Sequence, residues 1–428
     1  MSEAPSEDTV IHLADIRDKS KVWAMLAKTD KGAPLPTLSN VLIILRHDPV
    51  LAGIVTLNEF AYETAITRAP PAPDTDAPLL PGPYPRPWTE ADEALILAYI
   101  QRRWMAKASD KALSAAMNAE AAMRGFHPVR EWLDSLEWDG HKRLDTWLIR
   151  AFGCTDDNYH RDVAAKFLIA AVRRIRQPGC KFDFMPVFEG DQGIGKSTVI
   201  KTLFSPEWFS DSMPRDLGHK DAAIGLLGIW CVEMAEIDTL IRSEVETIKA
   251  FLSRGTDKYR PPYGKRDVIR DRQGVICGTT NAKDYLRDTT GNRRFWPIPC
   301  SFANVEWIAD NREQLWAEAV IAEKTGEPIW LEDAEVQTVA QSAQEDRIAE
   351  DTWHEKIAVY ILGRTQISTS ELLVYCLDIP VKDHERRLLL RVAAILRQLD
   401  WWVKVVREGQ AVTRLWFHPD LKNGSKQS

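Results

Sequence analysis

The chain has 428 residues, 45% hydrophobic and 27% charged, an ordinary globular composition with room for roughly two to four domains. No run of about 18 apolar residues occurs and the polar start MSEAPSEDTV has no apolar stretch, so neither a membrane span nor a signal peptide is expected. The formal net charge of −7 excludes a basic nucleic-acid coat, so any nucleic-acid contact must come from a local patch or an inner channel. The six cysteines lack a Cys-x-x-Cys pair, which argues against a zinc ribbon and favours free thiols in a reducing cytoplasm.

The first part of the chain is interrupted by prolines. Residues 1–69 mix short helical and apolar patterns and are predicted to be an N-terminal accessory segment. Eight prolines lie between Pro70 and Pro87, too many for a helix or an inner strand. We therefore predict that residues 70–87 are an extended linker and a domain boundary.

Helical patterns fill residues 88–178, which we predict to be a helical collar. Thr89 is a suitable N-cap for the helix EADEALILAYIQRRW, and Ser109 for a helix that stops at Gly125. Two further helices are expected, one through REWLDSL and one from Tyr159 to Arg176.

The pattern changes near Pro178. Short β-like runs alternate with loops and helices in the order FMPVF, GIWCVE, GVICGTT and FWPIP. This alternation is typical of α/β proteins and predicts a parallel-sheet core over residues 179–350.

The end of the chain predicts a separate small domain. Residues 351–420 contain three helical patterns, followed by the strand patterns WWVKVV and TRLWF. Three helices and a β-hairpin are the elements of a winged helix, a variant of helix-turn-helix. Residues 421–428 are a polar tail.

A glycine-rich motif follows the first predicted strand of the core. Residues 190–197 read GDQGIGKS, which fits the pattern G-x-x-x-x-G-K-[ST] between a strand and a helix. Glycines let the backbone wrap a phosphate, and the lysine reaches the β- and γ-phosphates while the hydroxyl holds Mg²⁺. The predicted ATP-contacting residues are Gly190, Asp191, Gln192, Gly193, Ile194, Gly195, Lys196, Ser197 and Thr198.

Polar residues also end the next two core strands. Glu233 ends an apolar run, and Glu236 follows three residues later; a carboxylate there suits Mg²⁺ and an attacking water. Alternatively, Glu233 is a solvated loop residue and Glu236 caps the next helix. Asn281 follows GVICGTT and is predicted to orient the hydrolytic water.

Two sets of basic residues remain. Arg293 and Arg294 are candidates to enter a neighbouring subunit's nucleotide site, or else are ordinary surface or salt-bridged arginines. The stretch from Arg254 to Arg272 is basic, with Tyr259 and Tyr263 interleaved, which suits a single-strand backbone unless it is a solvated loop. The candidate nucleic-acid contacts are Lys258, Arg260, Lys265 and Arg266.

Together, these motifs resemble the superfamily 3 helicases, AAA+ motors of viruses and plasmids, and above all the virulence-associated protein E family of phage and pathogenicity-island proteins. The resemblance runs from roughly Pro34 to Asp351. It rests on NVLIILRHDP, LNEFAYE, HPVREWLDSLEWDGHKRLDTWL, PGCKFDFMPVFEGDQGIGKST, EMAEIDTLIRSEVETIKAFLSRGTDKYRPPYG, TTNAKDYLRDTTGNRRFWP and QLWAEA.

The resemblance implies roles for individual residues. Lys196 and Ser197 match the Walker A pair, Glu233 matches the Walker B acid, and Asn281 matches sensor 1. Arg294 matches the arginine finger, with Arg293 as the second candidate. Lys249 and Asp257 fall in the segment that leads into the DNA-facing hairpin of related helicases. Many relatives end Walker B with two adjacent acids, whereas Met234 follows Glu233 here, so the roles of Glu233 and Glu236 stay open.

The expected function is ATP-dependent and Mg²⁺-dependent unwinding of, or translocation along, single-stranded or forked DNA in phage or mobile-element replication. An arginine finger acts across a subunit boundary, which implies a ring, with a hexamer expected, and a primase or initiation protein is a further expected partner. The alternative is a non-translocating ATP switch, an initiator or assembly factor that binds DNA through its winged helix.

Overall fold

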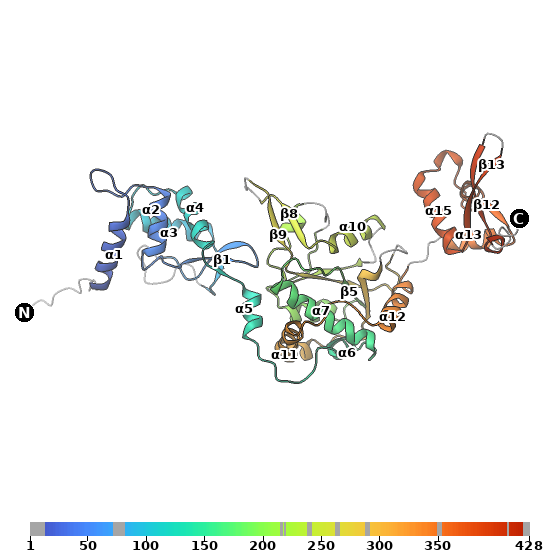
Figure 1. Cartoon of the computed structure of the whole chain (residues 1–428), viewed down its shortest axis with the longest axis horizontal. Helices are drawn as coiled ribbons and strands as arrows, with labels where there is room; N and C mark the ends of the chain where they lie inside the picture. The colour runs from blue at the N-terminus through green and yellow to red at the C-terminus, as the bar shows by residue number, and fades with distance from the viewer. Residues whose placement is uncertain are drawn as a thin grey trace, which may run out of the picture. The chain divides into compact units, whose positions relative to one another are not determined.

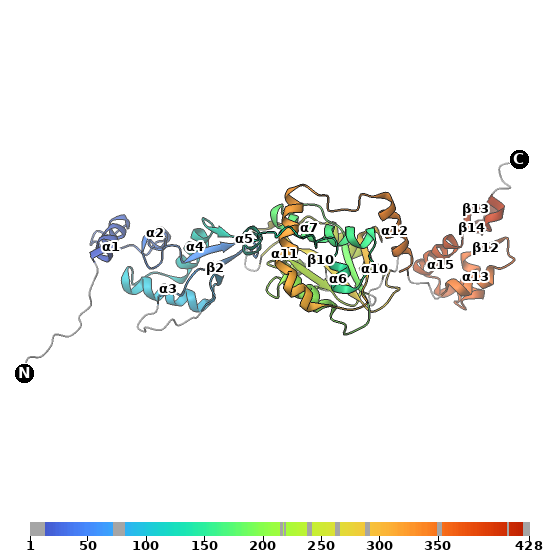
Figure 2. The same ribbon diagram turned by 90° about the horizontal axis from the view of Figure 1, so that it is seen from below.

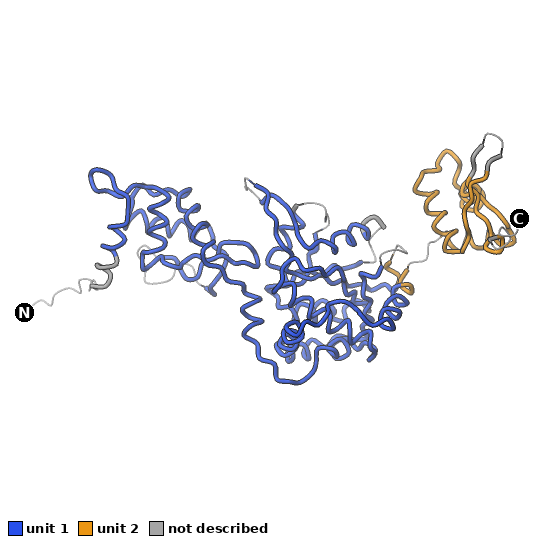
Figure 3. Tube along the Cα trace, in the orientation of Figure 1, with its two compact units in different colours: residues 1–283, 290–344 blue, residues 284–289, 345–428 orange. Residues whose placement is uncertain are grey.

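The computed structural model describes residues 13–71, 82–214, 217, 220–237, 242–261, 266–286, 292–348, 353–408 and 411–422. The chain forms two compact units, one of residues 1–283 and 290–344, the other of residues 284–289 and 345–428 (Figure 3). Within the described residues, no helix combines the length and the apolar character that crossing a bilayer requires.

Residues 13–126, the N-terminal module, are the first part of the larger unit. Its four-stranded sheet has the order β3-β2-β1-β4. Thr89 and Ser109 cap α3 and α4 as predicted, each accepting a hydrogen bond from the backbone three residues on. The elements are α1 (Leu13–Met25), α2 (Leu38–His47), β1 (Val55–Asn58), β2 (Glu63–Ile66), β3 (Arg86–Pro87), α3 (Glu90–Arg103), α4 (Asp110–Ala121) and β4 (Gly125–Phe126).

The predicted boundary at residues 70–87 does not separate two cores. Residues on both sides of it, such as Ile44 and Ile100, share one buried apolar cluster, and Arg86–Pro87 pair with β2. The helices on either side each expose an apolar face that only the other can cover. Gly125 also does not stop α4, which ends at Ala121; instead, Gly125–Phe126 add a strand beside β1.

The remainder of the larger unit, residues 127–344, is the sheet body. Its five-stranded sheet has the order β11-β5-β10-β7-β6, and every pairing in it is parallel. The predicted mixed α/β fold with a parallel sheet is therefore confirmed. The strands are β5 (Met185–Glu189), β6 (Phe209–Ser210), β7 (Cys231–Met234), β10 (Val275–Thr280) and β11 (Phe295–Pro299). The two-residue strand β6 was not predicted, because so short a run has no period to detect.

Helices cover the sheet. Helices α7 and α11 lie side by side in both views (Figure 1 and Figure 2), and they pack on a core that contains Trp147, Phe188, Trp230 and Trp316. The Trp230 and Trp316 ring centroids are 4.1 Å apart. The helices of this body are α5 (Pro128–Ser135), α6 (Trp147–Phe152), α7 (Asn158–Arg176), α8 (Lys196–Phe204), α9 (Lys220–Ile224), α10 (Arg242–Leu252), η2 (Asn292–Arg294), α11 (Val305–Lys324) and α12 (Ala334–Glu345).

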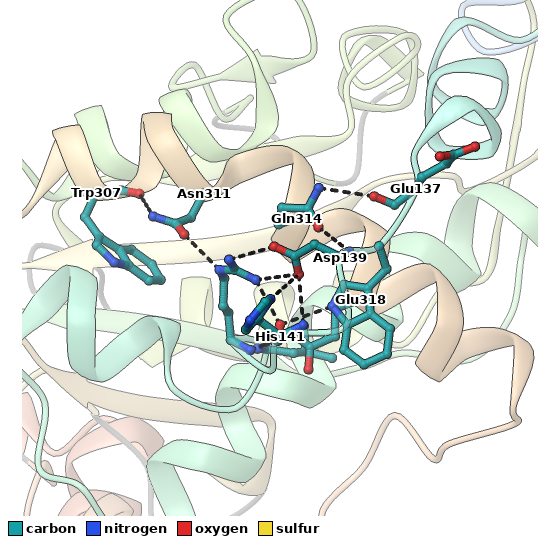
Figure 4. Close-up of polar contacts among 10 residues, drawn as sticks. Glu137, Asp139, His141, Trp307, Asn311, Gln314 and Glu318 are labelled. Carbon is teal, nitrogen blue, oxygen red and sulfur yellow. Dashed lines mark hydrogen bonds and ion pairs between the residues drawn. The ribbon is translucent and has the colours of Figure 1, made fainter.

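The loop between α5 and α6 is fastened to α11 by polar contacts (Figure 4). The Arg143 guanidinium donates to Asp139 at 2.9 Å and to Asn311 Oδ1 at 2.9 Å, while Glu318 Oε2 accepts from the backbone of Arg143 at 2.6 Å. Asp139 N donates to Gln314 Oε1 at 2.8 Å. The hydrogen bonds from Arg143 lower the pKa of Asp139 to about 2. These contacts therefore fix the position of α6, which follows the loop, relative to α11.

A two-stranded antiparallel hairpin projects on the other side of the body from α6, α7 and α11 (Figure 1). It consists of β8 (Thr256–Tyr259) and β9 (Val268–Asp271), with Lys258 opposite Ile269. The hairpin lies in the chain between β7 and β10, as the sequence predicts. Residues 262–265 at its turn, including Lys265 and Tyr263, lie outside the described residues.

The second unit contains helices and a three-stranded antiparallel sheet of order β12-β14-β13. Ile357, Leu372, Val392, Leu396 and Trp416 are among its buried core residues. Strand β12 was not predicted. The elements are α13 (His354–Ile361), β12 (Gln366–Ser368), α14 (Thr369–Glu371), η3 (Leu372–Cys376), η4 (Val381–Asp383), α15 (Arg386–Gln398), β13 (Trp402–Glu408), β14 (Ala411–Phe417) and η5 (Pro419–Lys422).

Candidate functional site

The predicted phosphate-contacting residues lie at the carboxyl end of the parallel sheet. Strand β5 ends at Glu189, the glycine-rich loop of residues 190–195 follows, and α8 begins at Lys196. Glu189 pairs with Thr280, and Glu233 pairs with Cys277 on the same strand β10. Parallel strands end at the same edge of a sheet, so the three predicted motifs meet there.

Two glycines determine the backbone conformation of the loop. Gly190 has φ +156°, and a Cβ added to it would lie 2.6 Å from the carbonyl oxygen of Cys300. Gly195, at the N-cap of α8, has φ +100°. A side chain at either position would be strained, so both glycines are required by the backbone itself. The loop thereby opens directly into a helix N-terminus, where backbone N–H groups favour an anion.

The side chain of Lys196 folds back onto this loop. Its Nζ donates to the carbonyl oxygens of Gly190 at 2.6 Å and Asp191 at 2.9 Å, and to Asn281 Oδ1 at 3.2 Å. Burial lowers the pKa of the Lys196 ammonium, because desolvation disfavours its charged form. Lys196 thus joins the loop to Asn281, the residue predicted to orient water.

Glu233 is the centre of a second set of contacts. Its side chain is buried, and Oε1 accepts hydrogen bonds from Ser197 Oγ at 2.6 Å and Thr279 Oγ1 at 2.6 Å. Its other oxygen, Oε2, is buried and has no hydrogen-bond partner among the described residues. A hydroxyl and a carboxylate with a spare oxygen are a donor set that suits Mg²⁺, which keeps several waters as its other ligands. The residues present therefore fit this cation.

Glu236 differs from Glu233 in its surroundings. It lies three residues beyond Glu233, is exposed and has φ +54°, a left-handed backbone conformation that is uncommon for glutamate. Strained residues of this kind gather at functional sites.

Thr279 is a residue of the site that the sequence analysis does not predict, because it is assigned there only to the strand GVICGTT. Its place two residues before Asn281 is the signal that could have found it, since it puts a hydroxyl at the same sheet edge.

The two arginines lie at the opposite end of the sheet. They precede β11, whose first residue Phe295 pairs with Met185 at the start of β5. Five residues of strand separate them from the glycine-rich loop, which is about 16 Å along the sheet. Arg293 is exposed, whereas Arg294 Nε lies 3.6 Å from Asp183 Oδ2, a partner that the sequence did not indicate. The chain does not bring either arginine to its own glycine-rich loop.

The predicted nucleic-acid contacts divide into exposed and buried positions. Lys258, Arg260 and Arg266 are exposed on the hairpin, and Lys258 Nζ lies 3.8 Å from Asp267 Oδ2. Tyr259, one of the two tyrosines interleaved in this basic stretch, is only 6% exposed, because alternate strand residues face opposite sides and Tyr259 faces the body.

The root of the hairpin is held by a buried ion pair. Arg272 Nε donates to Asp257 Oδ2 at 2.6 Å, and its guanidinium carbon lies 3.8 Å from the centroid of the Phe251 ring. Lys249 is also buried and lies 3.1 Å from Glu246. Asp257 therefore fixes the root of the hairpin through Arg272, and the pair of Lys249 with Glu246 lies within α10, whereas Lys258, Arg260 and Arg266 are exposed.

The fold and this site define a mixed α/β protein with a five-stranded parallel sheet and a glycine-rich loop at its carboxyl edge. Residues 133–349, half of the chain, match the family model of the virulence-associated protein E-like domain. The chain belongs to this family, as the sequence motifs indicated.

Among solved structures, the chain is similar to the apo structure of the NrS-1 C-terminal region, with 14% identity, 67% of this chain and 78% of that chain covered, and a TM-score of 0.40. It is also similar to an A-form apo structure of the same region, with 13% identity, the same shares covered and a TM-score of 0.38. A search of curated proteins returned no match.

Proposed function

We propose that this protein is an AAA+ ATPase of the superfamily 3 helicase type, which uses ATP to translocate along or unwind DNA during replication of a phage or integrated mobile element. The observation that carries the proposal is the contact set Lys196–Asn281 and Ser197–Glu233–Thr279 at the carboxyl edge of a parallel sheet. Membership of the virulence-associated protein E-like family supports the same conclusion.

The contacts suggest a role for each residue. Residues 190–198 would hold the phosphates of ATP, and Lys196 would exchange its carbonyl partners for the β- and γ-phosphates. Ser197 and Glu233 would hold Mg²⁺, which when bound supplies positive charge against the phosphate oxygens. Asn281 would orient the attacking water. Because Ser197 already engages Glu233, we assign Glu236 to activating that water.

A second copy of the chain would complete the site. Arg293 and Arg294 lie at the far end of the sheet from their own loop, so an arginine that neutralises the γ-phosphate must come from a neighbour. A head-to-tail contact repeated in this way gives a ring where the rotation between subunits closes, and an open filament where it does not. We propose a ring, with a hexamer as the expected size.

The hairpin is the proposed single-strand contact. Lys258, Arg260 and Arg266 are exposed on an element that lies in the chain between the Glu233 strand and the Asn281 strand, and Lys265, the fourth predicted contact, lies outside the described residues. Charged contacts of this kind bind the phosphate backbone irrespective of sequence. Movement of those strands with nucleotide state would move the hairpin and the DNA with it.

A non-translocating ATP switch is the second candidate. One observation favours it: the second unit has the element order α13, β12, helix, α15, β13, β14, with the sheet order β12-β14-β13, which supports the proposal of a winged helix. Arg386 and Arg387, exposed at the start of α15, would face duplex DNA. A switch would need this unit and not the hairpin.

The double variant Lys258→Ala/Arg266→Ala separates motor from switch. We expect the log–log salt slope of single-strand binding to fall by about 1.4, at about 0.7 for each phosphate that is no longer neutralised. Basal ATPase should persist, because neither Lys258 nor Arg266 belongs to the glycine-rich loop, whereas DNA-stimulated ATPase and separation of a forked duplex should disappear. Lys107→Ala/Lys324→Ala, which removes two exposed lysines elsewhere, is the charge-matched control. Unwinding at the wild-type rate by the hairpin variant would mean that the hairpin is only a solvated loop and would remove the main support for the channel motor. A wild-type protein that hydrolyses ATP but separates no forked duplex would favour the switch.

A further inference from the structure

We propose that the turn Asn58–Tyr62, which joins β1 to β2 and is called the docking turn below, positions the β8–β9 hairpin. Tyr62 and Gln273 are the positioning residues. The inference rests on the proposed function only in taking the hairpin as the DNA contact; the mechanical link itself rests on the short distances between the two elements.

The docking turn inserts into the sheet body. Asn58 Oδ1 accepts from the backbone of Phe60 at 3.0 Å and of Ala61 at 3.1 Å, which fixes the shape of the turn. The Phe60 side chain is 3% exposed and belongs to the core of the sheet body, and its carbonyl oxygen accepts from Gly228 N at 3.2 Å. A Cβ on Gly228 would come 3.1 Å from that of Ala61, so the two backbones approach closely.

Tyr62 is held in a strained conformation against the hairpin. Its φ is +54°, which is a genuine outlier for a bulky residue. Its ring centroid lies 4.2 Å from the Arg270 guanidinium carbon, and Arg270 is in β9. Strain of this kind persists only where the surroundings enforce it. The cation–π contact with Arg270 and a hydrogen bond from Gln273 are those surroundings.

Gln273 connects the turn to both the hairpin and the sheet. Its Nε2 donates to Glu59 O at 3.1 Å and to Tyr62 Oη at 3.2 Å. Its Oε1 lies 2.6 Å from His127 Nε2 and accepts from it, while His127 Nδ1 accepts from Arg130 N at 3.1 Å. The Gln273 side chain, 7% exposed, thus has all its partners within the protein and is fixed in one orientation.

The contacting residues Arg270 and Gln273 lie in the chain directly before β10, so the docking turn is connected through them to the carboxyl edge of the sheet. Arg270 is the last residue but one of β9, Gln273 follows the hairpin, and β10 then leads to Thr279 and Asn281 at the carboxyl edge of the sheet. A cavity of about 50 Å³ lies behind the hairpin root, between residues that include Phe182, Leu252 and Tyr259. Tyr62, Arg270 and Gln273 line the same cavity, so the docking turn forms one of its walls and supplies packing contacts to the hairpin root.

The first test measures amide hydrogen exchange in the full-length protein without nucleotide or DNA. Tyr62→Ala should speed exchange in residues 256–259 and 266–271 roughly tenfold, because the variant lacks both a partly desolvated cation–π interaction and a hydrogen bond. Exchange in β5 and α8 should stay at the wild-type rate. Tyr62→Phe keeps the ring over Arg270 and should have a smaller effect. In Tyr62→Ala/Arg270→Ala, the effects on exchange should be less than additive.

The second test uses activity. Tyr62→Ala should lower the stimulation of ATPase by single-stranded DNA roughly tenfold while the basal rate and the KM for ATP stay unchanged. Unchanged exchange in the hairpin would overturn the inference, and so would a rise of equal size in β5 and α8, which would make the turn a general stabiliser. If hairpin exchange rises but wild-type protein shows no DNA-stimulated ATPase, the proposed function fails and the positioning role stands.

Discussion

The two ends of the parallel sheet differ in how their polar residues are satisfied. At the carboxyl end, Lys196, Ser197, Glu233 and Thr279 hydrogen-bond within one chain, over distances of 2.6 to 3.2 Å. At the amino end, Arg293 is exposed and Arg294 lies 3.6 Å from Asp183, and both arginines lie far from the glycine-rich loop of their own chain. The polar residues of the carboxyl end therefore contact one another across neighbouring strands, whereas the arginines of the amino end contact none of them.

The catalytic residues expected from the sequence therefore cannot all act within a single chain. About 16 Å of strand separates the arginines from the glycine-rich loop, far beyond hydrogen-bond reach. Either the arginines have no catalytic role or two copies meet so that the amino end of one faces the carboxyl end of the next. Variants at each end, and then at both ends together, distinguish these cases.

The largest effect is expected at the carboxyl end. Lys196→Ala should lower ATP turnover by about 10³-fold or more, the loss of roughly 4 kcal/mol of transition-state stabilisation, because a buried cation aimed at the phosphates is removed. Steady-state ATPase measures it, with Lys201→Ala, an exposed lysine on the same helix, as the control. Turnover within a few-fold of wild type would mean that the glycine-rich loop is not the hydrolytic site.

The next largest effect concerns stability at the root of the hairpin, near the amino end. Arg272→Ala should lower the free energy of unfolding by about 3 kcal/mol, because it leaves the buried carboxylate of Asp257 without its partner. Arg266→Ala, at an exposed hairpin position, should change it by less than about 0.5 kcal/mol. Urea unfolding of the two variants compares them directly. Equal effects would show that the ion pair contributes little.

The smallest effect is expected for a variant of Thr279, which acts through Glu233 and would not itself contact a ligand. Thr279→Val removes the hydroxyl that donates to Glu233, so Glu233 keeps only one of its two fixed hydrogen bonds. The Mg²⁺ concentration for half-maximal ATPase should rise by about 10- to 100-fold, the usual cost of removing an outer partner of a metal ligand. Thr202→Val on α8 is the control. An unchanged Mg²⁺ requirement would show that the Thr279 hydroxyl does not help to position Glu233 for Mg²⁺.

The sequence predicts the position of a residue best where the topology of a parallel sheet alone brings the motifs together. Lys196, Glu233 and Asn281 each end or follow a strand, so a parallel sheet brings them together whatever the details of packing. It failed where strand register or long-range packing decides. Tyr259 and Lys258 are neighbours of similar apparent function, yet one faces the body and the other solvent.

The proline-rich segment shows a similar limit. Its composition predicts an extended chain, and Arg86–Pro87 at its end are indeed extended, but they pair with β2. Composition cannot reveal that α2 and α3, on either side of it, bury their apolar faces in one shared core. Contacts between residues far apart in sequence, including those of Tyr62 with Arg270 and Gln273, leave no local signal.

Mixing two inactive variants tests the central claim, that the two ends of the sheet meet across a subunit boundary. Lys196→Ala keeps the arginines, and Arg293→Ala/Arg294→Ala keeps the loop, so each protein alone should be inactive. In a one-to-one mixed ring, about one quarter of interfaces pair an intact loop with intact arginines, so ATPase should recover to roughly that share of wild type. No recovery from subunits shown to co-assemble, or full activity of the double arginine variant alone, would contradict the account.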